Sequence, residues 1–160
     1  MNDTDKVKSS ENYLIEQYKL YVEMADRMLA RRVQANSFYT SLLTGLIAFP
    51  SLVGGQNITD EFKKLSFLGI SLLGLLLCIL WTVTIRAYRD LSTSKFQVIN
   101  EMEKLLPFSC YEKEWDILMR IRKGKPYVRL TVIEQYVPLI ISIPYAVLLV
   151  YSISGFIKKL

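Results

Sequence analysis

The chain has 160 residues and a formal net charge of +5, with 51% hydrophobic and 22% charged residues. This length allows one domain and little more. Because the sequence has no histidine, imidazole acid–base catalysis and histidine-bound metals are excluded. Its two cysteines, Cys78 and Cys110, cannot build a disulfide framework.

Three apolar runs without any Asp, Glu, Lys or Arg dominate the sequence: residues 37–55, 65–85 and 137–157. They have 19, 21 and 21 residues, and a bilayer core of about 30 Å needs roughly 20 helical residues to cross it. The runs predict an all-α integral membrane protein with three transmembrane helices. Pro138 and Pro144 interrupt the third run, which leaves a re-entrant or tilted segment as the alternative.

The basic residues predict how the chain is oriented. Residues 1–36 carry six Lys and Arg and residues 86–136 carry ten, whereas the loop 56–64 and the tail 158–160 carry two each. By the positive-inside rule the N-terminus and the central segment are cytoplasmic, and the loop and tail lie outside. The charged N-terminus has no apolar signal-peptide core, so we expect the first span to direct insertion.

An amphipathic helix is expected in the cytoplasmic residues 1–36, capped by Ser10 and bearing a Glu23–Arg27 pair on its polar face. Its apolar stripe can pack on the chain's own cytoplasmic part, on a neighbouring subunit or on lipid. We take the stripe, which has heptad spacing as in a coiled coil, as a candidate subunit contact: Leu14, Tyr18, Tyr21, Ala25 and Met28.

The same helix is expected to continue into the first span, where Ser37, Ser41 and Gly45 recur every four residues. Small residues at this spacing let two membrane helices approach closely. The partner is either a neighbouring subunit, which we take as the candidate, or the chain's own second span. Hydroxyls such as Thr40 and Thr44 either line a passage or bond back to their own helix.

Beyond the second span, the helical pattern continues to Leu106 and ends at Pro107, with Trp81 suited to the membrane interface. Residues 109–112 read as a capping box. They open a short helix whose apolar side includes Trp115, predicted to point inward with Tyr111 and Leu118. This small subdomain has few apolar residues, which favours packing against other copies and makes Trp115 a further candidate contact.

Charged residues near the short helix suggest no catalysis. Glu112, Glu114 and Asp116 are more typical of a solvated face than of a metal site. The basic cluster is either a topology signal or a site for anionic lipid head groups, at about 1 kcal/mol per basic residue; it comprises Arg120, Arg122, Lys123 and Lys125.

No nucleic-acid or catalytic motif is present, so we expect no enzyme, no cofactor and no nucleic-acid partner. Spans without ionisable residues also disfavour a proton- or ion-coupled carrier.

The residues after the second span resemble a known group of proteins. Ile85-Arg86-Ala87-Tyr88-Arg89-Asp90-Leu91, Lys95-Phe96-Gln97-Val98-Ile99-Asn100-Glu101 and the Leu106-Pro107 to Trp115 stretch are similar to the RipA-type octameric proteins of the bacterial cytoplasmic membrane. A more distant similarity is to two-span membrane effectors of anti-phage operons.

This resemblance implies a homo-oligomer of the bacterial inner membrane, with eight as the expected number of copies and roles in defence or stress. One hypothesis is therefore a ring that alters membrane permeability when a cytoplasmic protein triggers it. The other is a non-conducting scaffold that recruits cytoplasmic partners through residues 86–136.

Overall fold

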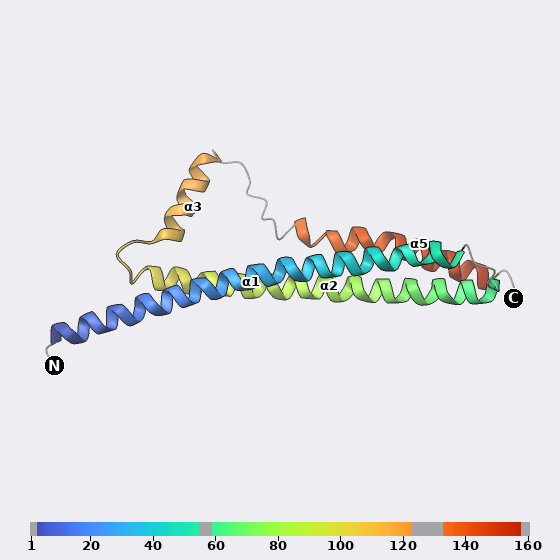
Figure 1. Cartoon of the computed structure of the whole chain (residues 1–160). Helices are drawn as coiled ribbons and strands as arrows, with labels where there is room; N and C mark the ends of the chain where they lie inside the picture. Colours follow the sequence, from blue (N-terminus) through green and yellow to red (C-terminus); the bar gives the residue numbers. More distant parts are fainter. Residues whose placement is uncertain (1–2, 55–58, 123–132, 158–160) are drawn as a thin grey trace. The chain divides into compact units, whose positions relative to one another are not determined.

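The computed structural model describes residues 3–54, 59–122 and 133–157, and the side chains of residues 12–49, 59, 61–122 and 133–155. Within these residues the fold is all-helical and contains no strand. Figure 1 labels the four helices, which are α1 (Asp3–Gly54), α2 (Asp60–Glu103), α3 (Cys110–Ile121) and α5 (Val137–Ile157).

The chain divides into two compact units. Unit 1 comprises Met1–Arg32 and Tyr88–Val128, and unit 2 comprises Val33–Ala87 and Arg129–Leu160. Both α1 and α2 contribute residues to each unit. Neither helix contains a glycine or proline at the point where the units divide, so each continues there as one helix. The expected continuation of the N-terminal helix into the first apolar run is thereby confirmed.

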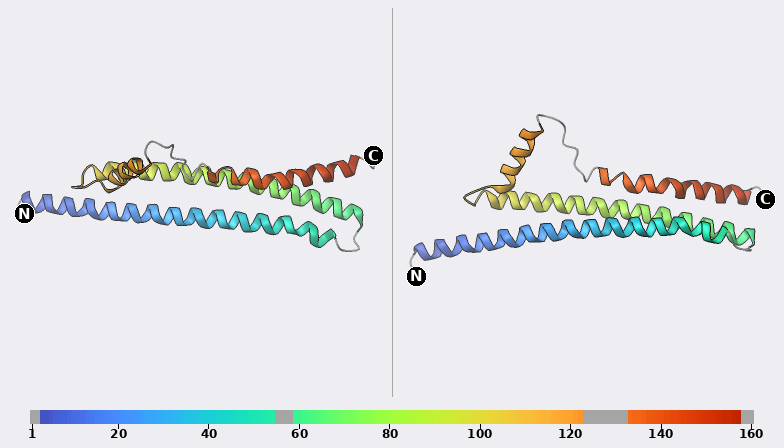
Figure 2. Two further views of the ribbon diagram at one scale, coloured as in Figure 1. Left: turned by 90° about the horizontal axis from the view of Figure 1, so that it is seen from above. Right: turned by 45° about the horizontal axis from the view of Figure 1, so that its top comes forward.

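In unit 2, α2 runs antiparallel to both α1 and α5 (Figure 2). The indole N–H of Trp81 donates to Asn36 Oδ1 at 2.9 Å, which fixes the register of α2 on α1. At the other end of α2, Lys64 Nζ donates to the carbonyl of Gly155 on α5 at 2.9 Å, and Ser152 Oγ donates to the Lys64 carbonyl at 3.0 Å.

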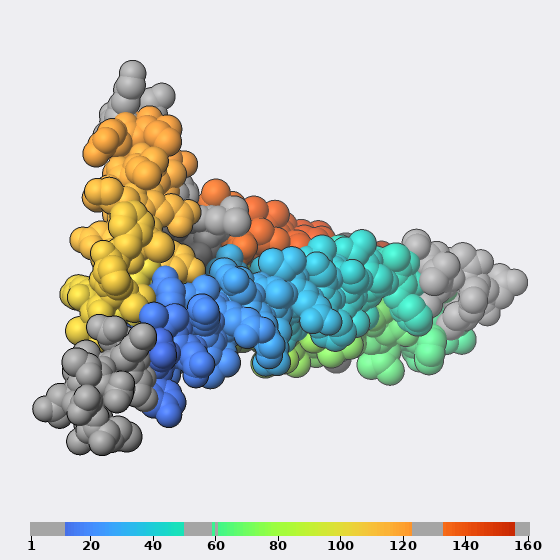
Figure 3. Space-filling model, turned by 60° about the vertical axis from the view of Figure 1, so that its left-hand side comes forward, coloured from blue at the N-terminus to red at the C-terminus, as the bar shows by residue number. Residues whose placement is uncertain are grey.

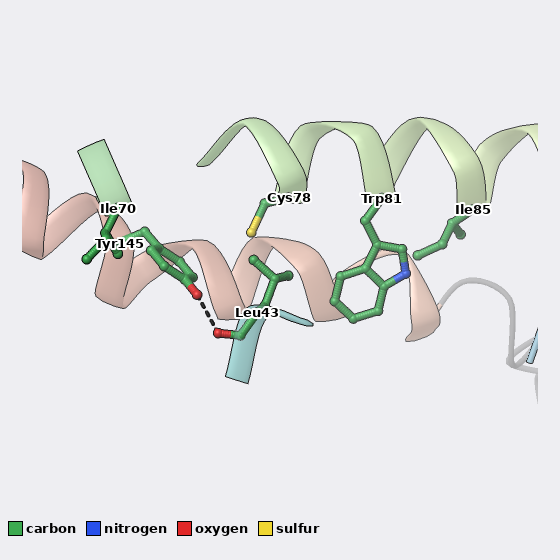
Figure 4. Close-up of a cluster of buried hydrophobic side chains, with 6 residues drawn as sticks. All are labelled: Leu43, Ile70, Cys78, Trp81, Ile85 and Tyr145. Atoms are coloured by element: carbon green, nitrogen blue, oxygen red, sulfur yellow. Dashed lines mark hydrogen bonds between the residues drawn. The ribbon is translucent and has the colours of Figure 1, made fainter. Parts of the chain in front are cut away.

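The core of unit 2 draws on all three of these helices (Figure 4). The ring of Tyr145 covers Gly74 so closely that a Cβ there would overlap it. Its hydroxyl donates to the carbonyl of Leu43, which satisfies a polar group that would be costly in an apolar interior. The buried cluster consists of Leu43, Ile70, Cys78, Trp81, Ile85 and Tyr145.

Two helical stretches are long and apolar enough to cross a membrane, Glu61–Glu103 and Val137–Gly155. Large apolar side chains on both remain exposed, as lipid contact requires; they include Leu72, Leu76, Ile79, Ile140, Val147 and Val150. The helix α5 coincides with the third apolar run and continues through Pro144. The first run lies at the end of α1, and its crossing of the membrane stays a prediction.

Four local predictions were wrong. The first helix begins at Asp3, not at Ser10. The second ends at Glu103, not at Leu106, because two tight turns follow it, with Leu105 N–H on the Met102 carbonyl and Leu106 N–H on the Glu103 carbonyl.

Trp81 does not face the membrane interface, because its side chain is buried in the core of unit 2. Burial is tolerated there since the indole N–H donates to Asn36 Oδ1. Ser109 occupies the N-cap position of α3, but its side chain makes no capping hydrogen bond.

Candidate functional site

One side of α1 in unit 2 carries small and hydroxyl-bearing residues, which we call the hydroxyl face: Ser37, Thr40, Ser41, Thr44 and Gly45. All five are exposed, and a Cβ added at Gly45 would meet nothing within 4 Å. The alternative that this face packs on the chain's own second span is therefore not supported by the described residues. Contact with another subunit stays a prediction.

The two threonine hydroxyls of this face bond back to their own helix. Thr40 Oγ1 donates to the Asn36 carbonyl and Thr44 Oγ1 donates to the Thr40 carbonyl, both at 2.8 Å. Because the donor is used in this way, the lone pairs of each oxygen stay available to water or a partner. The face is therefore polar without being charged.

A groove of about 380 Å³ opens along the first half of the hydroxyl face. One wall consists of Glu134, which lies just before α5 and is half-buried. The remaining lining residues come from α1: Val33, Asn36, Ser37, Thr40 and Ser41. The groove thus combines neutral hydroxyl and amide groups with one carboxylate.

Behind the groove, aromatic residues hold the two long helices together. The rings of Tyr39 and Trp81 stack with a centroid separation of 5.8 Å and an interplanar angle of 10°, and the Tyr39 and Thr84 hydroxyls lie 3.4 Å apart. Together with the Asn36–Trp81 bond, these contacts fix the orientation of the α1 residues that carry the hydroxyl face.

In unit 1, the predicted heptad stripe of α1 is turned toward α2. Tyr18 Oη donates to Glu103 Oε1 at 2.8 Å, and the ammonium of Lys95 lies 4.8 Å from the centroid of the Tyr21 ring, a cation–π distance. Ala25 and Met28 are buried and Leu14 is half-buried. The stripe thus packs within the chain, and a further contact with a neighbouring subunit stays a prediction. The Glu23–Arg27 pair is confirmed at 2.6 Å.

Among the described side chains of unit 1, Glu103 is the most deeply buried charged one, with 1% of its surface exposed. Besides the Tyr18 hydroxyl, its two carboxylate oxygens accept the backbone N–H of Tyr111, each at 3.1 Å. Tyr111 lies in the first turn of α3, where N–H groups lack helical partners and the helix dipole favours negative charge. Glu103 therefore caps the N-terminus of α3, a role that the sequence analysis assigned to a capping box in residues 109–112.

The tyrosines around Glu103 respond to this environment. Burial, the hydrogen bond to Glu103 and the negative charge of Glu103 hold the pKa of Tyr18 above its ordinary value. Burial also raises the pKa of Tyr111, with smaller contributions from the charges of Asp26 and Glu114. Both phenols thus stay neutral and able to donate hydrogen bonds at physiological pH.

The helix α3 leaves most of its apolar side chains exposed and has no buried residue. Trp115 is 42% exposed, so the prediction that it points inward is wrong; only Tyr111 and Leu118 are half-buried. The first turn of α3 contacts α2, where the Tyr111 ring meets Phe96 edge-on at 5.7 Å. On the face shown in Figure 3, α3 (orange) is visible over its length.

The predicted charged sites lie partly outside the described residues. Glu112, Glu114 and Asp116 are exposed, as expected of a solvated face, and Arg120 and Arg122 lie at the end of α3. Lys123 and Lys125 fall outside the described residues, so a lipid head-group site remains a prediction. Among the described residues, no group of three or more His, Cys, Asp or Glu side chains could hold a metal ion.

Sequence reasoning missed Glu103, Asn36 and Lys64, whose partners lie 85, 45 and 91 residues away. For Glu103, the sequence signal was its position on the apolar side of α2, where that helix should face α1. For Lys64, the signal was that a basic residue lies at the edge of an apolar run.

Comparison with known proteins complements this geometry. No curated protein and no solved structure matches the chain. The model of one protein family matches residues 15–154, which include most of the described part of unit 2, the packed stripe of α1 from Tyr18 onward and all of α3. The two apolar helices, the all-helical fold and this match agree, and the chain belongs to the octameric membrane protein family (8xMP).

Proposed function

We propose that eight copies of this chain form a ring in the bacterial inner membrane that encloses a passage along the hydroxyl face, and that opening of the passage changes membrane permeability during defence or stress. Each chain crosses the membrane three times with its N-terminus in the cytoplasm, and a cytoplasmic protein acting on unit 1 triggers opening.

The observation that carries this proposal is the exposed hydroxyl face of α1. It lies away from the core of unit 2, since Leu43 on the same helix is buried while Thr40, Ser41 and Thr44 are exposed. A polar stripe in a membrane helix is favourable against another helix or against water, and unfavourable against lipid tails. In a ring of eight, the two favourable environments are the subunit contact and the axis.

Chemical accessibility tests whether water reaches the face. In a background with Cys78→Ala and Cys110→Ser, Thr44→Cys in reconstituted octamers should react with a charged, membrane-impermeant thiosulfonate at least about tenfold faster than Leu76→Cys. The reason is that a thiol reacts as its thiolate, which forms only where water is present. Leu76 is the matched control because it is exposed on the apolar outside of α2.

Equal, slow reaction at both positions in an octamer of intact mass would refute a wet passage. If Thr44→Cys reacts rapidly, release of dyes of graded size from liposomes then measures the width of the open state. The same proteoliposomes, incubated with cytoplasmic extract, report whether a soluble protein increases release.

A second candidate function rests on the exposed Trp115 of α3. A tryptophan presented on the surface is a frequent anchor of protein interfaces, and it favours a non-conducting scaffold that recruits cytoplasmic proteins through residues 86–136. This alternative predicts a stable complex that Trp115→Ala abolishes and no dye release under any condition that supports the complex.

A further inference from the structure

The symmetry of the octamer restricts how its subunits can touch. Identical chains carry the same topology signals and insert in the same orientation. A two-fold axis in the plane of the membrane would require half of the copies to be inverted, so dihedral symmetry is excluded. A closed cyclic ring remains, and its contacts are heterologous, so that each subunit offers two different surfaces that fit each other.

Unit 1 has two exposed apolar stripes that no described residue covers. The first, on α3, is formed by Glu114, Ile117 and Ile121, which follow one another on one side of the helix. Ile121 is 71% exposed. Ile117 and Ile121 are offset around the helix from Tyr111, which packs on Phe96, and Glu114, three residues after Tyr111, lies between the two sides.

The second stripe lies on α1, beside the stripe that packs on α2. Tyr13, Leu20, Met24 and Arg31 recur at intervals of seven, four and seven residues, which brings them to one side of a helix. All four are exposed, Leu20 by 58%. Two apolar stripes on so small a unit leave it with much uncovered surface, which is typical of an interaction site.

The two stripes match in both length and charge. Glu114 and Ile121 are seven residues apart on α3, and Met24 and Arg31 are seven residues apart on α1. At 1.5 Å per residue both pairs span about 10 Å. With the helices antiparallel, Ile121 meets Met24 while the carboxylate of Glu114 meets the guanidinium of Arg31.

We propose that α3 of each subunit docks antiparallel on α1 of the next subunit, with Ile121 against Met24 and Glu114 against Arg31. This contact closes the ring outside the membrane. It rests on the octamer of the family and on unit 1 alone, so it stands whether or not the ring encloses a water-filled passage.

Cross-linking between two differently tagged chains tests the contact. Chains with Met24→Cys and chains with Ile121→Cys, each lacking Cys78 and Cys110 through substitution by Ala and Ser, are co-expressed and oxidised in membranes. We expect a cross-linked dimer that carries both tags. The matched control replaces Met24→Cys by Tyr13→Cys, which lies on the same stripe but about 16 Å further along the helix and should give at most a tenth of the product.

The tags make the result decisive. Dimers of one tag only would indicate a symmetric contact and overturn the proposal, as would equal yields from Met24→Cys and Tyr13→Cys. Absence of any product, with octamers intact by native mass spectrometry, would mean that lipid or another protein covers α3, and would also overturn it. None of these outcomes affects the thiol accessibility of Thr44→Cys, so the two proposals fail separately.

A charge exchange gives an independent measurement. Arg31→Glu should weaken each subunit contact by up to about fivefold, as expected for an exposed ion pair. Addition of Glu114→Arg to the same chain should restore the octamer. Failure of the double variant to recover, with monomer helicity unchanged, would contradict the proposed register.

Discussion

The buried carboxylate of Glu103 allows a quantitative test of how α3 is held. The perturbation is Glu103→Gln, which keeps the size of the side chain but removes its charge and one of its two acceptor oxygens. In the native chain the two oxygens accept the Tyr111 N–H, and Oε1 also accepts the Tyr18 hydroxyl. The amide of glutamine can serve these two donors through only one oxygen.

The magnitude follows from the contacts that are lost. A hydrogen bond to a charged group contributes about 1.5–3 kcal/mol, and a negative charge at a helix N-terminus contributes about 0.3–1 kcal/mol or more when partly buried. Since glutamine retains a weaker acceptor, we expect α3 to lose about 2 kcal/mol of protection against local opening. At 1.4 kcal/mol per factor of ten, amide exchange in α3 becomes about thirtyfold faster.

Hydrogen–deuterium exchange read by mass spectrometry on peptides of residues 110–121 measures this change. Glu101→Gln is the matched control, because Glu101 carries the same charge two residues earlier on α2 and is exposed. Similar exchange in both variants would refute the capping role of Glu103 and assign the hold on α3 to other contacts, such as that between Phe96 and Tyr111.

Three further predictions concern single side chains. Gly74→Ala should destabilise unit 2 by about 1–3 kcal/mol through overpacking against Tyr145, and should lower the melting temperature of the detergent-solubilised protein. Gly69→Ala is the control: a Cβ at Gly69 meets nothing within 4 Å, so the melting temperature should stay unchanged. Because the folded-state pKa of Tyr18 lies above the unfolded value of about 10, the tyrosine contributes stability below that pH and loses it as pH rises further. The drop in melting temperature between pH 9 and 11 should therefore be smaller for Tyr18→Phe. Gly45→Leu should reduce the octamer in native mass spectra, and a full octamer in this variant would place the hydroxyl face away from the subunit contacts.

Much of the fold followed from the sequence because single helices depend on local patterns. Uncharged runs of about 20 residues located α5 and the apolar part of α2. The absence of glycine and proline between Leu14 and Thr44 predicted that α1 continues into the first run. The Glu23–Arg27 pair, four residues apart on one helix face, was predictable for the same reason.

What the sequence did not reveal depends on pairing between distant segments. The aromatic-belt rule placed Trp81 at the membrane interface, but Asn36 on α1 satisfies its N–H and allows burial. A capping box was a sound local expectation for α3, yet the first turn is capped from α2, where Glu103 accepts the Tyr111 N–H. In both cases a long-range hydrogen bond replaced the local one, and no pattern along the chain reports such a partner.

The proposed passage also has a consequence for ion selectivity. The three apolar runs contain no charged residue, and the Thr40 and Thr44 hydroxyls that we place along the passage are neutral. Channels select ions by charge through rings of charged side chains, so a passage lined by hydroxyls should discriminate weakly between potassium and chloride. In planar bilayers with a KCl gradient, we expect a reversal potential close to zero, far from the Nernst potential of either ion. A strongly cation-selective current would instead indicate that a carboxylate outside the runs lines the narrowest point of the passage. Glu134, which lines the groove beside Ser37, is the candidate. In that case Glu134→Gln should abolish the selectivity.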